Sequence, residues 1–124
     1  MMTLRLFSAL VALSLAGAAN AMPVQTFLEK MDALQSKGAF AMFSGDLKVL
    51  IAQIKVDFAQ LRADRLAAQA AHQQPAFCPT AGGIKMTNQD IRRAMEAVPQ
   101  VDRAATDTRE ALKTYLSRRF PCRG

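Results

Sequence analysis

The pair of cysteines, Cys78 and Cys122, constrains the fold of this chain more than any other feature, because the 124 residues contain no others. The N-terminal segment predicts export, and exported chains meet an environment that oxidises thiols. We therefore expect one intramolecular disulfide. In the chain-entropy model, a cross-link over a loop of this length stabilises the folded state by about 4 kcal/mol. That is much of the net stability of a small domain, so the fold is expected to depend on it.

Residues 1–21 have the order of a secretory signal peptide. Arg5 supplies one positive charge, residues 6–16 form an apolar run, and Ala19-Asn20-Ala21 ends the segment with small residues. Signal peptidase recognises this order, and the run is shorter than the roughly 20 apolar residues of a membrane anchor. The sequence predicts cleavage after Ala21, a periplasmic location and no membrane span in the mature chain.

The mature chain is expected to form one domain over residues 22–124. The 124 residues less the 21 of the leader leave 103, which is enough for one modest core. Loss of Arg5 lowers the formal charge from +6 to +5, which favours acidic partners or an anionic envelope surface. Nucleic acid is not expected as a partner, because the basic residues are interspersed with acidic ones and the chain has one Tyr and no Trp.

Apolar residues recur at helical spacing, and no segment shows the alternation of a strand. We therefore predict an all-α fold, a small bundle of about four helices with one disulfide. The expected helices cover roughly 24–36, 44–71, 87–98 and 106–120. Ser44 and Thr87 precede the second and third as N-caps, Asp90 completes a capping arrangement with Thr87, and Pro75 is expected to close the second.

The central helix is predicted to turn one apolar stripe toward the core, while its charged residues occupy other faces. The expected stripe is Leu47, Leu50, Ile51, Ile54, Phe58, Leu61 and Arg65, and the charged residues are Lys48, Lys55, Asp57, Arg62 and Asp64. The apolar segment 39–43 is too short for an independent helix and is expected to tuck into the core. Core positions are also expected for Met31, Met42 and Met95. In the last helix, Ala111, Leu112, Tyr115 and Leu116 are expected to face inward.

No group of residues predicts catalysis, so we expect a protein that is not an enzyme and has no cofactor. His72 is the single histidine and is expected to be solvated in a polar helix tail. The cysteines are expected to be bridged, which leaves no nucleophile and no ligand set for a metal. Asp102, Asp107 and Glu110 could share one face, although a turn and the first turn of a helix explain them more simply. The Gly82-Gly83 pair lacks the pattern of a phosphate-binding loop.

The C-terminal half resembles the Rap/Tai-type immunity proteins of type VI secretion. The resemblance lies in Phe77-Cys78-Pro79 with a following Gly-containing loop, a short helix ending near Val98-Pro99, and a helix with Ala111-Leu112 that closes in Phe120-Pro121-Cys122. It covers about a third of the precursor well and the upstream helices only loosely. The resemblance implies a helical periplasmic antitoxin that binds and blocks a peptidoglycan amidase or a related wall hydrolase. It also implies that the chain could form a homodimer.

The loop between the second and third helices is the predicted contact with such an effector, although an ordinary solvated connector is an equally good interpretation. Its residues are Thr80, Ala81, Gly82, Gly83, Ile84 and Lys85. Two other functions stay open. One is a small periplasmic stress or chaperone-like protein that holds unfolded clients, and the other is a basic helical surface that attaches to anionic lipid or wall polymer.

Overall fold

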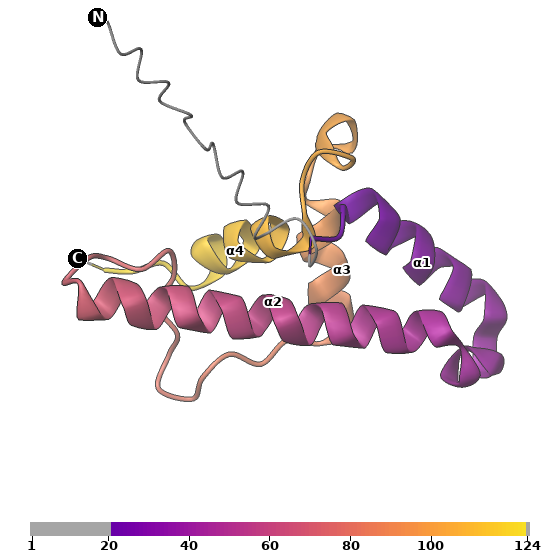
Figure 1. The fold of residues 1–124 in the computed structure, drawn as a ribbon, viewed down its shortest axis with the longest axis horizontal. Coiled ribbons are helices and arrows are strands. Elements are labelled where there is room, and N and C mark those ends of the chain that lie inside the picture. Colours follow the sequence, from indigo (N-terminus) through magenta and orange to yellow (C-terminus); the bar gives the residue numbers. More distant parts are fainter. Residues whose placement is uncertain (1–20, 124) are drawn as a thin grey trace, which may run out of the picture.

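The computed structural model describes residues 21–123, so residues 1–20 of the predicted leader, which spans 1–21, lie outside the described part. Along the chain follow α1 (Val24–Lys37), the 3-10 helix η2 (Gly38–Phe43), α2 (Gly45–Ala70), α3 (Asn88–Glu96), the 3-10 helix η3 (Gln100–Asp102) and α4 (Thr108–Arg119). Within residues 21–123, β-type backbone pairing is limited to an isolated antiparallel bridge between Pro23 and Asp107. The all-α prediction is therefore confirmed. Figure 1 shows α2 running the length of the molecule, with α1, α3 and α4 packed on one side of it.

Local capping signals place the helix starts. The Ser44 hydroxyl accepts a hydrogen bond from the backbone N–H of Asp46 before α2. Thr87 and Asp90 form the reciprocal capping box predicted for α3, and the Asp107 carboxylate accepts from the backbone of Glu110 before α4. These side chains satisfy donors that the first helical turn cannot pair internally.

The predicted start of α2 is confirmed, and its end differs slightly. The helix ends at Ala70, and His72 adopts a left-handed backbone with φ of 55°. The backbone therefore leaves the helical conformation before Pro75, which is not the residue that ends the helix. His72 itself is exposed, as predicted.

The core lies between α1, α3, α4 and one face of α2. In α4, Ala111, Leu112 and Leu116 are buried as predicted, and Tyr115 is half-buried. In α2, Leu50 and Leu61 are buried, whereas Ile51 is nearly half exposed. The other buried apolar residues of the core are Val24, Phe27, Leu28, Leu34, Phe77, Ala94 and Met95.

The predicted disulfide joins Cys78 to Cys122 across 44 positions of sequence. Next to it, the backbone N–H of Cys78 donates to the carbonyl of Phe120 at 2.8 Å, and the Phe77 side chain enters the core. The bridge thus fastens the segment after α2 to the end of α4. Without it, that segment would be held by Phe77 in the core, by the partly buried Ile84 and Met86, and by the backbone hydrogen bond from Cys78 to Phe120.

The prediction that segment 39–43 enters the core is wrong. Phe40 and Met42 are each 78% exposed and Phe43 is 88% exposed, and of this segment Ala41 is the residue that packs partly against the core. The reason is position: η2 reverses the chain between α1 and α2 at the end of the molecule, away from α3 and α4 (Figure 1). Of the three core methionines expected, Met95 is buried, Met31 is half-buried and Met42 is exposed.

The prediction that Asp57 lies on a solvent face of α2 is also wrong. Its side chain is buried, with the residue 3% exposed. The Thr108 hydroxyl donates to Asp57 Oδ2 at 2.6 Å, and Gln53 Nε2 donates to Oδ1 at 3.0 Å. Because the first residue of α4 packs here, a polar pair bridges α2 and α4 where helical periodicity had indicated a surface position.

Candidate partner-binding site

An apolar groove of about 380 Å³ lies between α1 and α2, with α3 contributing to one part of it. Figure 1 shows why it is there: α1 leaves α2 at an angle beyond η2, and α3 stands where the two have diverged. Its lining is Phe27, Met31, Leu34, Gln35, Leu47, Leu50, Ile51, Ile54, Lys55, Asn88 and Ile91. A cleft lined mainly by apolar side chains with a few polar groups at its rim is the usual form of a binding site.

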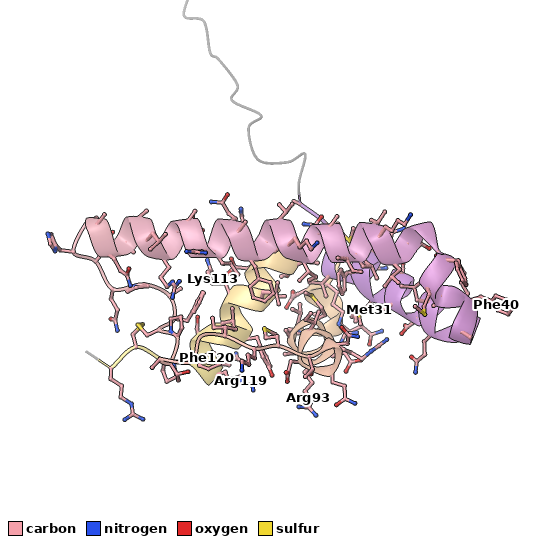
Figure 2. All side chains as sticks on the ribbon, turned by 90° about the horizontal axis from the view of Figure 1, so that it is seen from below. Met31, Phe40, Arg93, Lys113, Arg119 and Phe120 are labelled. Atoms are coloured by element: carbon pink, nitrogen blue, oxygen red, sulfur yellow. A yellow bond between two sulfur atoms is a disulfide. The ribbon has the colours of Figure 1, made fainter. Side chains whose placement is uncertain are left out.

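Three large apolar side chains extend the apolar surface beyond the helix pair. Phe40, Met42 and Phe43, here called the apolar tip, belong to η2, which connects the two helices that form the groove. Figure 2 shows Phe40 at the extremity of the molecule, pointing away from the helices, while Met31 lies further in. Exposed aromatic side chains grouped in this way are typical of surfaces that bind another protein.

Polar contacts, rather than apolar burial, hold the tip in position. Lys30 on α1 pairs with Asp46 at the start of α2, with Nζ and Oδ1 3.1 Å apart. Lys37 Nζ also reaches the Ser44 hydroxyl at 3.3 Å, and Gly38 adopts the positive φ of 55° that ends α1. The three apolar side chains are therefore presented on a fastened turn while remaining free to contact a partner.

An arginine ties α1 to α3 near the groove. Arg92 donates to Asp32 on α1 at 3.0 Å and to Glu96 on its own helix at 3.1 Å. The hydrogen bond to Glu96, followed by that to Asp32, raises the pKa of Arg92 above its usual value. Lys55 is the charged residue among those that line the groove. The groove therefore favours an apolar segment of a partner protein that carries a carboxylate where it meets Lys55.

The predicted contact loop is exposed but separate from the groove. Thr80, Ala81, Gly82, Gly83 and Lys85 are exposed and Ile84 is half-buried, and the groove lining includes none of the six. A turn closes the loop: the backbone N–H of Gly83 donates to the carbonyl of Thr80 at 2.9 Å, and Gly83 has a φ of 77°. The loop offers polar contacts and little apolar area.

The apolar tip was not predicted from the sequence, because an apolar run is expected to enter the core. A signal was available, since the run lies between Gly38 and Gly45 at the point where two helices of different direction must meet. A run of that kind forms the end of a helical hairpin, which the body of a small domain does not cover.

The other candidate chemical groups serve helix ends. Asp90 accepts from Thr87 in the capping box and pairs with Arg119 at 3.1 Å. The backbone and hydroxyl of Thr87, more than Arg119, lower the pKa of Asp90 below its usual value. Asp107 caps α4 and Glu110 pairs with Lys113 at 3.0 Å, whereas Asp102 lies in η3. Within residues 21–123, no three His, Cys, Asp or Glu side chains gather in a way that could hold a metal ion.

Burial raises the pKa of the Asp57 carboxyl above its ordinary value of 3.8, against the lowering effect of its hydrogen bonds from Thr108 and Gln53. The folded state therefore holds the proton more tightly than the unfolded state. The stabilisation from this tighter proton binding is complete below pH 3.8. It decreases as pH rises through the raised pKa of Asp57 and changes no further above that pKa. We expect D57N, which keeps an acceptor for Thr108, to gain stability relative to the wild type as pH rises from about 3 to 7.

Urea titrations over that pH range measure this effect. D57A is the control, because it leaves the buried Thr108 hydroxyl without its acceptor and should lose about 2 kcal/mol at neutral pH. A difference between D57N and wild type that does not change with pH would contradict the raised pKa.

No helix within residues 21–123 is both long enough and apolar enough to cross a membrane. Comparison of the chain with protein-family models, with curated proteins and with solved structures found no match in any of the three. The groove and the apolar tip therefore provide the structural argument for function.

Proposed function

We propose that this chain is a periplasmic immunity protein that binds a type VI secretion effector, a peptidoglycan amidase or a related wall hydrolase, and blocks it. It carries out no reaction itself. The observation that carries the proposal is the apolar tip, Phe40, Met42 and Phe43, exposed beside an apolar groove. Such a surface costs solubility and serves a protein that must bind another one tightly.

The form of the site supports inhibition by occlusion. A projecting turn with two aromatic side chains can enter the active-site cleft of a hydrolase, while the groove accepts an apolar segment from the rim of that cleft. Phenylalanine side chains each contribute roughly 1.5–3 kcal/mol on full burial, so Phe40 and Phe43 together can supply much of a strong interaction. The loop Thr80–Lys85 stays a predicted second contact, and its exposed polar backbone suits a role at the margin of the interface.

The identity of the partner as a wall hydrolase rests on the resemblance to Rap/Tai-type proteins. The residues that carry it, Phe77-Cys78-Pro79 and Phe120-Pro121-Cys122, form one disulfide-joined corner at the opposite end of α2 from the tip (Figure 1). In this proposal the corner holds the scaffold together and the tip makes the contact. Formation of a homodimer stays a prediction from the same resemblance.

The proposal is tested by expressing the full chain with a candidate effector in the periplasm and measuring cell lysis and binding. F40S/F43S should abolish protection and raise the dissociation constant at least about a hundredfold, which corresponds to the loss of roughly 2.7 kcal/mol. V101S is the matched control, because Val101 in η3 is 90% exposed and lies outside both the tip and the groove. Both variants should retain helical content and the disulfide.

A different result would support the chaperone-like alternative, which the apolar groove also permits. In that case the chain would suppress aggregation of several unrelated unfolded proteins at equal molar ratios, and no single hydrolase would bind tightly. Protection that survives F40S/F43S would show that the apolar tip is not the inhibitory surface.

A further inference from the structure

The long helix α2 has a second apolar face that no part of residues 21–123 covers. Val49 and Val56 are each 45% exposed and Leu66 is 51% exposed, and Ala52, Ala59, Ala63 and Ala70 are exposed as well. At 100° of rotation per residue these seven positions lie opposite the buried Leu50 and Leu61. Figure 2 shows that the other helices all lie on one side of α2, which leaves its opposite side without a neighbouring helix.

The spacing along this face is the heptad spacing of a helix that packs against another helix. Positions 49, 52, 56, 59, 63, 66 and 70 alternate steps of three and four residues over almost the whole of α2. On a straight helix such a repeat drifts by about 20° per heptad, so over three heptads it stays on one face and can pack along a second helix. The alanines among them leave space for a second helix to approach closely, with Val49, Val56 and Leu66 as the larger contacts. We call these seven residues the outer seam.

Cations follow one edge of the outer seam at the same period. Lys48, Lys55 and Arg62 are exposed, and within residues 21–123 none of them forms an ion pair. The opposite edge carries the neutral Gln53 and Gln60. In a helix pair, charges that flank the seam determine which partner is accepted and in which direction it lies.

These charges argue against a second copy of this chain as the occupant. In an antiparallel pair of α2 helices, like edges meet and the cations face cations. In a parallel pair, each cationic edge faces the partner's edge of Gln53 and Gln60, where the one exposed carboxylate nearby, Asp64, already accepts a hydrogen bond from Gln60 at 2.9 Å and cannot match three cations. A bilayer is also a poor match, because faces that enter lipid are rich in Trp, Phe and Leu, whereas four of the seven seam residues are alanine.

We propose that the outer seam of α2 binds an amphipathic helix of another protein, with carboxylates at heptad spacing along the edge that meets Lys48, Lys55 and Arg62. The seam supplies apolar contact and close approach, and the three cations select an acidic partner. This site is distinct from the apolar tip, so the chain could hold an effector and a second partner at once. The inference does not depend on the proposed immunity function.

The probe is a synthetic helix of about four heptads, with Leu and Ala at its seam positions and Glu along one edge. It is titrated against residues 22–124, the protein without its predicted leader. A second probe has Lys in place of each Glu. We expect the Glu probe to bind at least about tenfold more tightly than the Lys probe at low salt, with the difference reduced at high salt. K48E/R62E should reverse this preference. Lys55 is left unchanged because it also lines the groove.

A steric variant tests the seam itself. A59Q places a longer side chain at its centre and should weaken binding of the Glu probe about tenfold or more. A33Q is the matched control, because Ala33 is an exposed alanine on α1, away from the seam. F40S/F43S should leave probe binding unchanged, which separates this inference from the proposed function.

Three results would overturn the inference. The first is failure of the Glu probe to bind, and the second is binding that K48E/R62E and A59Q do not alter. The third is equal or stronger binding to phosphatidylglycerol vesicles, or dimerisation of the protein, that is lost in A59Q. Either form of the third result would assign the seam to lipid or to a second copy.

Discussion

Removal of the disulfide by C78S/C122S is expected to lower the free energy of unfolding by about 4 kcal/mol. The bond closes a loop with 44 positions of separation, and its loss gives the unfolded chain conformational freedom that the folded state must overcome. A domain of this size has a net stability of only about 5–15 kcal/mol. The variant should therefore have a substantial unfolded fraction at physiological temperature.

Urea titration followed by circular dichroism measures this loss. The wild type in reducing agent serves as the control, because it lacks the bond but keeps both cysteines, and it should unfold at nearly the same urea concentration as the double variant. If both retain the stability of the oxidised protein, the fold does not depend on the cross-link. Loss of stability in the variant alone would instead point to the serine side chains.

Truncation of Phe27 is expected to cost about 4 kcal/mol, within the roughly 3–5 kcal/mol typical of a buried Phe→Ala change. Phe27 is 2% exposed and packs where α1 meets the rest of the core. F27A removes its buried apolar area and enlarges the groove that Phe27 lines. The effect should appear as a lower urea midpoint and a lower melting temperature.

F40A is the matched control for this prediction, because it makes the same chemical change at a side chain that is 78% exposed. It should change the free energy of unfolding by less than about 0.5 kcal/mol, the usual range for surface substitutions. Equal effects of F27A and F40A on stability would contradict the burial of one and the exposure of the other. On the proposed function, F40A removes an exposed contact of the apolar tip, whereas F27A alters the wall of the groove as well as the core.

Much of the fold follows from local signals in the sequence. The helix starts at Ser44, Thr87 and Asp107 depend on a side chain and a backbone N–H two or three residues apart, so no distant part of the chain is needed to predict them. The disulfide followed from the number of cysteines together with the predicted export. The inward face of α4 followed from spacing, because packing occurs on one face of that helix.

The candidate sites were much less predictable. The chosen loop, Thr80–Lys85, lies apart from the groove, whereas the apolar tip had been assigned to the core. The outer seam on α2 was present in the sequence as a heptad repeat, but a helix with apolar residues on two faces does not indicate which face the domain will cover. One stripe was assigned to the core, and the other was left unassigned.

The sequence by itself determined the helices, their caps and the cross-link, since these depend on neighbouring residues or on the identity of two cysteines. Tertiary structure alone decided that Asp57 is buried against Thr108, that Phe40 and Phe43 are exposed, and that a groove opens between α1 and α2. The physical reason is that burial depends on which helices meet in space. Residues far apart in the chain, such as Asp57 and Thr108, acquire their surroundings only when those helices pack.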